Sequence, residues 1–149
     1  MTITALVDRL VEFLAAQLID VRLEPADGSD PRTPDLVAGW LPPIGAEGEP
    51  KIPLIIARAV SGQDADDGSA VTVQLYIETY SESEEGWRDV TNLVQRIRGA
   101  LTSARTIGPF CLSLPLTWQM SGDEPLPQWV AIMTTTWSVP RATWTESTQ

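Results

Sequence analysis

The chain has 149 residues, of which 43% are hydrophobic and 20% charged, and its formal net charge is −10 at pH 7. A chain of this size can bury the core of one domain. Ordinary nucleic-acid binding is disfavoured, because a binder needs lysine and arginine to replace the counterions of the phosphate backbone. The absence of histidine and the single cysteine exclude His-based triads, His-ligated zinc, thiolate zinc clusters and an internal disulfide. These exclusions favour a binding or assembly protein.

The first predicted element is an amphipathic helix from about Thr4 to Ile19. Its apolar residues recur at steps of three and four, as expected for a helix that packs one face on a core: Leu6, Val7, Leu10, Val11, Leu14 and Leu18. No segment approaches the roughly 18 uninterrupted apolar residues of a membrane-spanning helix. We therefore expect a soluble protein, made in a cytoplasm, with no membrane partner.

A proline-rich arm is predicted from residue 25 to residue 50, because six of the 12 prolines and four of the 10 glycines fall there. It contains an apolar island at Trp40, Leu41 and Ile44. The island either docks on a partner subunit or folds back onto the protein's own core.

Two strands are predicted next, from Ile52 to about Val60 and from Val71 to Glu78, joined by a turn over residues 61–69. They most simply form an antiparallel hairpin. The turn resembles the start of a calcium loop at Asp64, but Ser69 and Leu75 stand where an EF-hand needs glycine and glutamate. We expect a solvated hairpin tip and no metal site.

A second amphipathic helix is predicted from about Glu84 to Ser103, with Trp87 on its core stripe and a possible capping box at Ser81 and Glu84. Two further strands follow, at residues 110–118 and 129–139. Pro115 favours an edge position or a bulge for the first of these strands.

The predicted fold class is therefore α+β. We expect a single domain over residues 1–141, with a mainly antiparallel sheet of about four strands and two packed helices in the order α-β-β-α-β-β. Residues 142–149 form a loose tail. Cys111, between Phe110 and Leu112, is interpreted as a buried thiol rather than a reactive one.

Six tryptophans are a large number for one chain. Those on predicted strands and helices are assigned to the core, whereas Trp40 and Trp144 lie in irregular segments and are candidate interface residues. Neither a nucleotide-binding loop nor a nucleophile motif is present, and the acidic group at Glu82, Glu84 and Glu85 is best explained as helix-start carboxylates. We expect no catalytic residues, no enzyme activity and no cofactor.

Four segments carry a family resemblance. Residues 71–80 with the sequence VTVQLYIETY, residues 86–90 with GWRDV, and the closing pieces LPLTW and TTTWSVPR together resemble the tail terminator or tail completion proteins of tailed bacteriophages. The likeness covers about residues 52 to 141, roughly 60% of the chain.

This resemblance implies an α+β virion subunit that forms a ring, usually a hexamer, at the head-proximal end of the tail tube, after assembly in the host cytoplasm. The ring stops tube polymerisation and meets the head-tail connector or stopper protein, while genomic DNA passes without specific binding. An acidic lumen or axial surface would keep DNA from adhering, and its candidates are Asp64, Asp66, Asp67, Glu82, Glu84 and Glu85. The alternatives are a head-side neck or head-closure protein of the same particle, and an unrelated cytoplasmic protein-binding adaptor.

Overall fold

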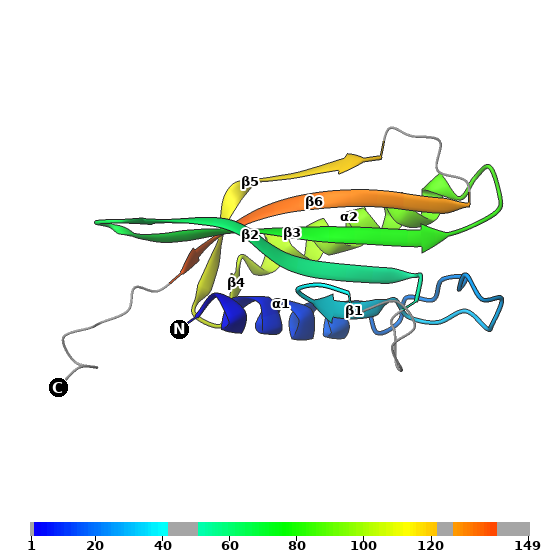
Figure 1. Cartoon of the computed structure of the whole chain (residues 1–149), viewed down its shortest axis with the longest axis horizontal. Helices are drawn as coiled ribbons and strands as arrows, with labels where there is room; N and C mark the ends of the chain where they lie inside the picture. The colour runs from blue at the N-terminus through cyan, green and yellow to red at the C-terminus, as the bar shows by residue number, and fades with distance from the viewer. Residues whose placement is uncertain (1, 42–50, 122–126, 140–149) are drawn as a thin grey trace.

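The computed structural model describes residues 2–41, 51–121 and 127–139. Two helices and six strands follow one another along the chain (Figure 1). Their bounds are α1 Ile3–Gln17, β1 Asp35–Ala38, β2 Leu54–Ala65, β3 Gly68–Tyr80, α2 Trp87–Ala104, β4 Thr106–Ile107, β5 Phe110–Met120 and β6 Gln128–Val139.

The predicted fold class is wrong in its sheet. The six strands form one curled, mixed sheet in the order β1-β2-β3-β6-β5-β4, not a four-stranded antiparallel sheet with the order α-β-β-α-β-β. The added strand β1 lies inside the predicted proline-rich arm and pairs in parallel with β2, from Asp35 opposite Leu54 to Ala38 opposite Ala57. The sequence analysis missed β1 because a strand of four residues among prolines has no periodic apolar pattern, and because its partner β2 lies further along the chain.

Both helices pack on the same face of the sheet, where they form one hydrophobic core with alternate strand residues. In Figure 1, α2 lies behind β3 and β6, and α1 runs beside β1 and β2. Strand β3 shows the alternation clearly, since Val71, Val73, Leu75 and Ile77 are buried and the residues between them are half-buried. We call the opposite side the helix-free face.

The predicted antiparallel pairing of the β2 and β3 segments is confirmed, but the hairpin is longer than expected. Its strands continue to Ala65 and Gly68, so the turn has two residues, Asp66 and Asp67, instead of nine. Beyond Ala59 every β2 residue is exposed, and the hairpin projects from the body of the molecule at the left of Figure 1. Both faces of this extension are solvated, so no hydrophobic period revealed it.

The start of α2 differs from the prediction. The helix begins at Trp87, its N-cap is Gly86, and no side chain caps it, so the expected capping box is absent. A close contact fixes this corner instead, because the Trp129 Nε1–H donates to the Ser81 carbonyl at 3.1 Å and a Cβ on Gly86 would lie 2.5 Å from that nitrogen. Trp87 is 42% exposed and does not belong to the core.

Strand β5 has both features that Pro115 suggested. The pairing of β5 with β6 shifts register between Ser113 and Thr117, which marks a bulge around the proline. On its other side, the described chain offers only the two-residue strand β4, opposite Phe110 and Cys111. Cys111 is exposed, not buried, because Phe110 takes the core-facing position beside it.

Candidate functional site

The clearest unsatisfied feature of the described chain is a pair of open sheet edges. We define the β2 edge as Arg58–Ala65 and the β5 edge as residues 113–120. Strand β1 pairs with β2 only as far as Ala57, and β4 pairs with β5 only at Phe110 and Cys111. Backbone N–H and C=O groups of an open edge are free to pair with another strand. The two edges lie on opposite sides of the sheet.

The base of the β2 edge carries an exposed apolar patch around Trp40. Trp40 is 71% exposed, and the guanidinium of Arg58 lies over its ring, 3.4 Å from the centroid. Arg58 Nε–H also donates to the Gly39 carbonyl at 3.0 Å, which holds the stacked geometry in place. Three other exposed apolar residues belong to this region: Ile3, Leu41 and Val60.

A shallow cavity of about 300 Å³ adjoins this patch, and its lining includes Ile3, Trp40, Arg58 and Ala59. The sequence analysis placed Trp40 and Leu41 at an interface, and the structure leaves both side chains exposed. Their interface role stays a prediction. The other two candidates, Ile44 and Trp144, lie outside the described residues.

The β5 edge carries the second patch, which the sequence analysis missed. Trp118 is 47% exposed and Leu114 is 53% exposed, although Trp118 had been assigned to the core. Trp118 pairs with Met133, a buried residue, so its side chain lies on the helix side of the sheet. There it borders a groove of about 280 Å³ against α2, lined also by Thr91, Val94, Gln95 and Arg98. Pro115 was the available signal, since it marked β5 as an edge.

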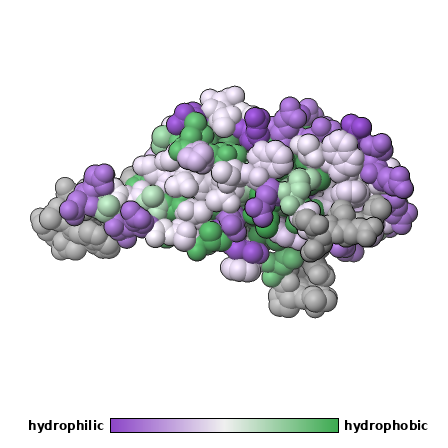
Figure 2. All heavy atoms as spheres, turned by 90° about the horizontal axis from the view of Figure 1, so that it is seen from above, coloured by the Kyte–Doolittle hydropathy of each residue, from purple (hydrophilic) through white to green (hydrophobic). Residues whose placement is uncertain are grey.

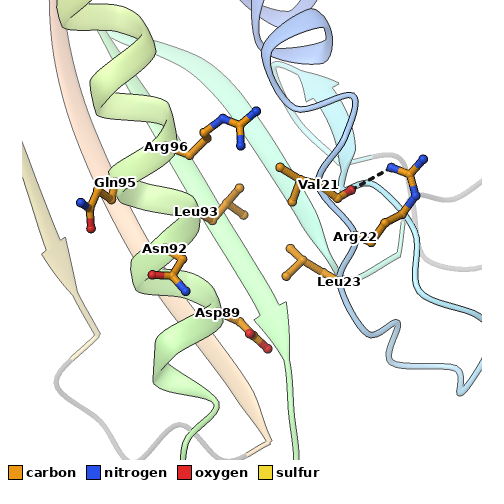
Figure 3. A pocket seen from close by; sticks show the side chains of 8 residues that line it. All are labelled: Val21, Arg22, Leu23, Asp89, Asn92, Leu93, Gln95 and Arg96. Atoms are coloured by element: carbon orange, nitrogen blue, oxygen red, sulfur yellow. Dashed lines mark hydrogen bonds between the residues drawn. The ribbon is translucent and has the colours of Figure 1, made fainter.

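A larger cavity, about 480 Å³, lies between α2 and the segment after α1 (Figure 3). Leu93 faces Val21 and Leu23 across it, with Asp89 and Arg96 toward its two ends. Burial raises the pKa of the Asp89 carboxyl above its ordinary value.

Both basic side chains that line this cavity, Arg22 and Arg96, are already engaged. Arg22 Nη1–H donates to the Ile19 carbonyl at 2.8 Å and to the Val21 carbonyl at 3.1 Å. Arg96 Nη2–H donates to Asp20 Oδ1 at 2.7 Å and to the Gln17 carbonyl at 3.1 Å. These bonds tie α2 to the end of α1. The cavity is therefore the junction between α2 and the segment that follows α1, and the Arg96 side chain stabilises that junction.

The six acidic candidates fall into two groups, which the structure does not bring together. Asp64, Asp66 and Asp67 lie at the projecting hairpin tip, and Glu82, Glu84 and Glu85 lie in the β3–α2 connection at the opposite end of the long axis (Figure 1). The view from the β5 side shows hydrophilic residues gathered toward both ends (Figure 2).

Local partners occupy several of these carboxylates. Ser69 Oγ–H donates to Asp64 Oδ1 at 2.6 Å, Tyr80 Oη–H to Glu82 Oε1 at 3.0 Å, and Arg88 Nε–H to Glu85 Oε2 at 2.8 Å.

The helix-free face carries few charges and is polar in its middle. On β3 and β6 it presents hydroxyl, amide and phenol groups at Thr72, Gln74, Tyr76, Thr134 and Thr136. It also presents two aliphatic residues, Val130 and Ile132, which lie opposite Glu78 and Tyr76. Glu78 accepts a hydrogen bond from Tyr76 Oη–H at 3.0 Å. Partial burial is the main cause that raises the pKa of Glu78, and burial followed by the Glu78 charge raises the pKa of Tyr76 to about 12.

Within residues 2–41, 51–121 and 127–139, no group of three or more His, Cys, Asp or Glu side chains is placed to hold a metal ion. Neither described helix is long and apolar enough to cross a membrane. No protein-family model matches the sequence, and a search of curated proteins finds no match.

Proposed function

We propose that this protein is a structural subunit of a tailed bacteriophage, a tail terminator that forms a ring at the head-proximal end of the tail tube. One observation carries the proposal beyond the sequence resemblance. The described sheet has open edges on two opposite sides, and each edge bears exposed apolar side chains. A subunit with two different, complementary edges repeats head to tail and closes into a ring when the rotation between copies allows it.

In the proposed ring, the two groups of acidic residues lie on the two axial surfaces. If copies join side by side through their sheet edges, the strands run roughly along the ring axis. The hairpin tip and the β3–α2 connection then fall on the two axial surfaces, one toward the tail tube protein and one toward the connector or stopper protein. Like charge at these two openings repels the DNA backbone and favours its passage without adhesion.

The helix-free face suits a channel lining for a related reason. Its threonine and glutamine side chains form hydrogen bonds with water and carry no positive charge that would attract phosphate. The cationic side chain on this face, Arg58, is stacked on Trp40. The helices then form the outer layer of the ring.

The proposal is tested by incubating the purified protein with isolated tails that lack it and with empty heads. We expect capture by tails, annular density at one tail end in negative stain, and no capture by heads alone. Capture by heads alone would favour the head-side neck alternative. A protein that binds neither would contradict the virion assignment and favour an adaptor.

Charge reversal of Glu82, Glu84 and Glu85 to lysine tests the axial placement, because these residues lie at the β3–α2 end, away from the sheet edges. We expect assembled particles with slower or incomplete DNA ejection, because the added cations hold phosphate at the openings. Unchanged infectivity and ejection would count against acidic axial surfaces.

A further inference from the structure

We propose that neighbouring copies join by antiparallel β-pairing, in which the β2 edge of one copy adds to the β5 edge of the next. One sheet then continues through the assembly. This inference rests on the proposed function, because it names the contact by which the ring forms.

Strand direction supports this pairing. β2, β3, β6 and β5 are successive antiparallel neighbours, so β2 and β5 run in opposite directions within one copy. A neighbour related by rotation about an axis along the strands keeps those directions. Its β5 edge therefore meets the β2 edge antiparallel, and the alternation continues across the junction. Because two different edges meet, the contact is heterologous and builds a ring rather than a two-fold dimer.

The usual protection against association is sparse on both edges. On the β2 edge it consists of the bulge at Val60 and two charged residues that have local partners, Arg58 stacked on Trp40 and Asp64 hydrogen-bonded to Ser69. Residues 110–120 contain no charged side chain, and neither do residues 59–63. Exposed edge strands that stay monomeric normally carry lysine or other inward-pointing charges. Here the protection on β5 is limited to the bulge at Pro115, so residues 116–120 remain available for pairing.

One register of this pairing brings exposed apolar side chains of the two edges together. Val60 is bulged out of the β2–β3 pairing and is 45% exposed. With Val60 of one copy beside Trp118 of the next, an aliphatic side chain meets the groove between Trp118 and α2. Ser61 then lies opposite Thr117, and both are on the helix-free face, since they pair with Thr72 and Thr134 within their own sheet.

Charge complementarity favours a second copy as the occupant. In the antiparallel arrangement the hairpin tip of one copy, with Asp64 and Asp67, points toward the first residues of the next copy's β5 edge. Arg105 flanks that end, because its Nη2–H donates to the Leu112 carbonyl at 3.2 Å. A second arginine, Arg98, borders the groove beside Trp118. Among the described residues neither arginine forms an ion pair, in a chain with twice as many acidic as basic residues.

Cross-linking tests the junction. In a Cys111→Ser background, Ser61→Cys and Thr117→Cys are introduced singly and together, and a flexible bismaleimide is added to the free protein and to tails that carry it. We expect a ladder of cross-linked oligomers from the double variant and monomers from either single variant, because each junction holds one residue of each kind.

The other outcomes separate the two proposals. A dimer from Thr117→Cys alone would overturn the heterologous pairing in favour of a two-fold β5–β5 contact. Rings or tail caps without cross-links would overturn the edge pairing and leave the proposed function standing. A protein that stays monomeric in solution and is not retained by tails would overturn both.

Two substitution series examine the same contact without cysteine. Trp118→Lys should weaken self-association by about thirtyfold or more, as for an aromatic hot spot. Trp87→Lys is its matched control, since Trp87 is 42% exposed but lies at the start of α2, and it should leave association unchanged. Equal effects of the two substitutions would contradict the inference.

Charge exchange completes the test. Asp67→Arg and Arg105→Glu should each weaken association roughly two- to fivefold, and the double variant should recover it, because the pair is restored in reversed order. Simple addition of the two losses would show that these side chains do not meet.

Discussion

Replacement of Trp40 by alanine separates a surface role of this residue from a core role. The ring is 71% exposed, and its main partner is the Arg58 guanidinium above it. If the side chain serves a contact between subunits, its removal should affect association far more than the free energy of unfolding.

The expected loss of stability is small. A tryptophan of about 250 Å² with 29% of its surface covered removes roughly 70 Å² from water, which is worth at most about 2 kcal/mol. The exposed cation–π contact adds about 0.5–1 kcal/mol. We expect Trp40→Ala to lower the free energy of unfolding by no more than about 2–3 kcal/mol.

Trp137→Ala provides the matched control, because Trp137 is fully buried in the core. It should cost about 3–5 kcal/mol, as for other large core truncations. Urea unfolding measured by circular dichroism gives both values, and light scattering gives the association state. A cost for Trp40→Ala equal to that of Trp137→Ala, or unchanged association of Trp40→Ala, would refute the surface role.

Three further predictions concern the frame that presents the two edges. Thr135→Val should cost about 1–3 kcal/mol of unfolding free energy, because the buried Trp137 Nε1–H loses its acceptor, Thr135 Oγ1 at 2.8 Å, and the Thr135 hydroxyl no longer donates to the Val73 carbonyl at 2.8 Å. In a Trp137→Phe background urea unfolding should show a smaller penalty, because only the bond to Val73 is then lost; an equal penalty in both backgrounds would contradict the role of Trp137. Gly86→Ala should lower the melting temperature, because the new Cβ would lie 2.5 Å from Trp129 Nε1 and 2.7 Å from Ser81 Cβ. Gly99→Ala is the control: a Cβ there has nothing within 4 Å, so the substitution should add about 0.5–1 kcal/mol of stability. Equal effects of the two substitutions would contradict the close contact at Gly86. Because the pKa of Glu78 is raised in the fold, the unfolding free energy should fall as pH rises above the ordinary value of 4.5; Glu78→Gln should exceed the wild type in stability at pH 7 and match it in acid, and a constant difference across pH would refute the assignment.

The local periodic elements of this fold could be predicted from the sequence. The first helix was expected from about Thr4 to Ile19 and runs from Ile3 to Gln17, and the pairing of the two central strands was also expected. In each case a repeating apolar pattern records which side faces the core.

The missed elements share a physical cause. Strand β1 is defined by pairing with β2, not by its own pattern, and the outer part of the β2–β3 hairpin has no buried face that could leave a period in the sequence. The burial of Trp118 was also predicted wrongly, although the alternation of residues along β5 was predicted correctly. Trp118 occupies a core-side position, but it lies on an edge strand where little covers it.

The candidate site was only partly predictable. The irregular context of Trp40 indicated an exposed aromatic residue. The β5 edge is open because β4 has only two residues, and no local sequence pattern predicts the length of β4. The acidic residues were considered as one set, whereas the long axis of the sheet divides them between two ends.

The length distribution of tail tubes tests the central claim most directly. Tube subunits are polymerised with and without the purified protein, and the products are measured by negative-stain electron microscopy. We predict shorter tubes that carry an annular cap at one end and do not elongate when fresh subunits are added. Tubes of unchanged length, with bare ends that continue to grow, would contradict the assignment as a tail terminator.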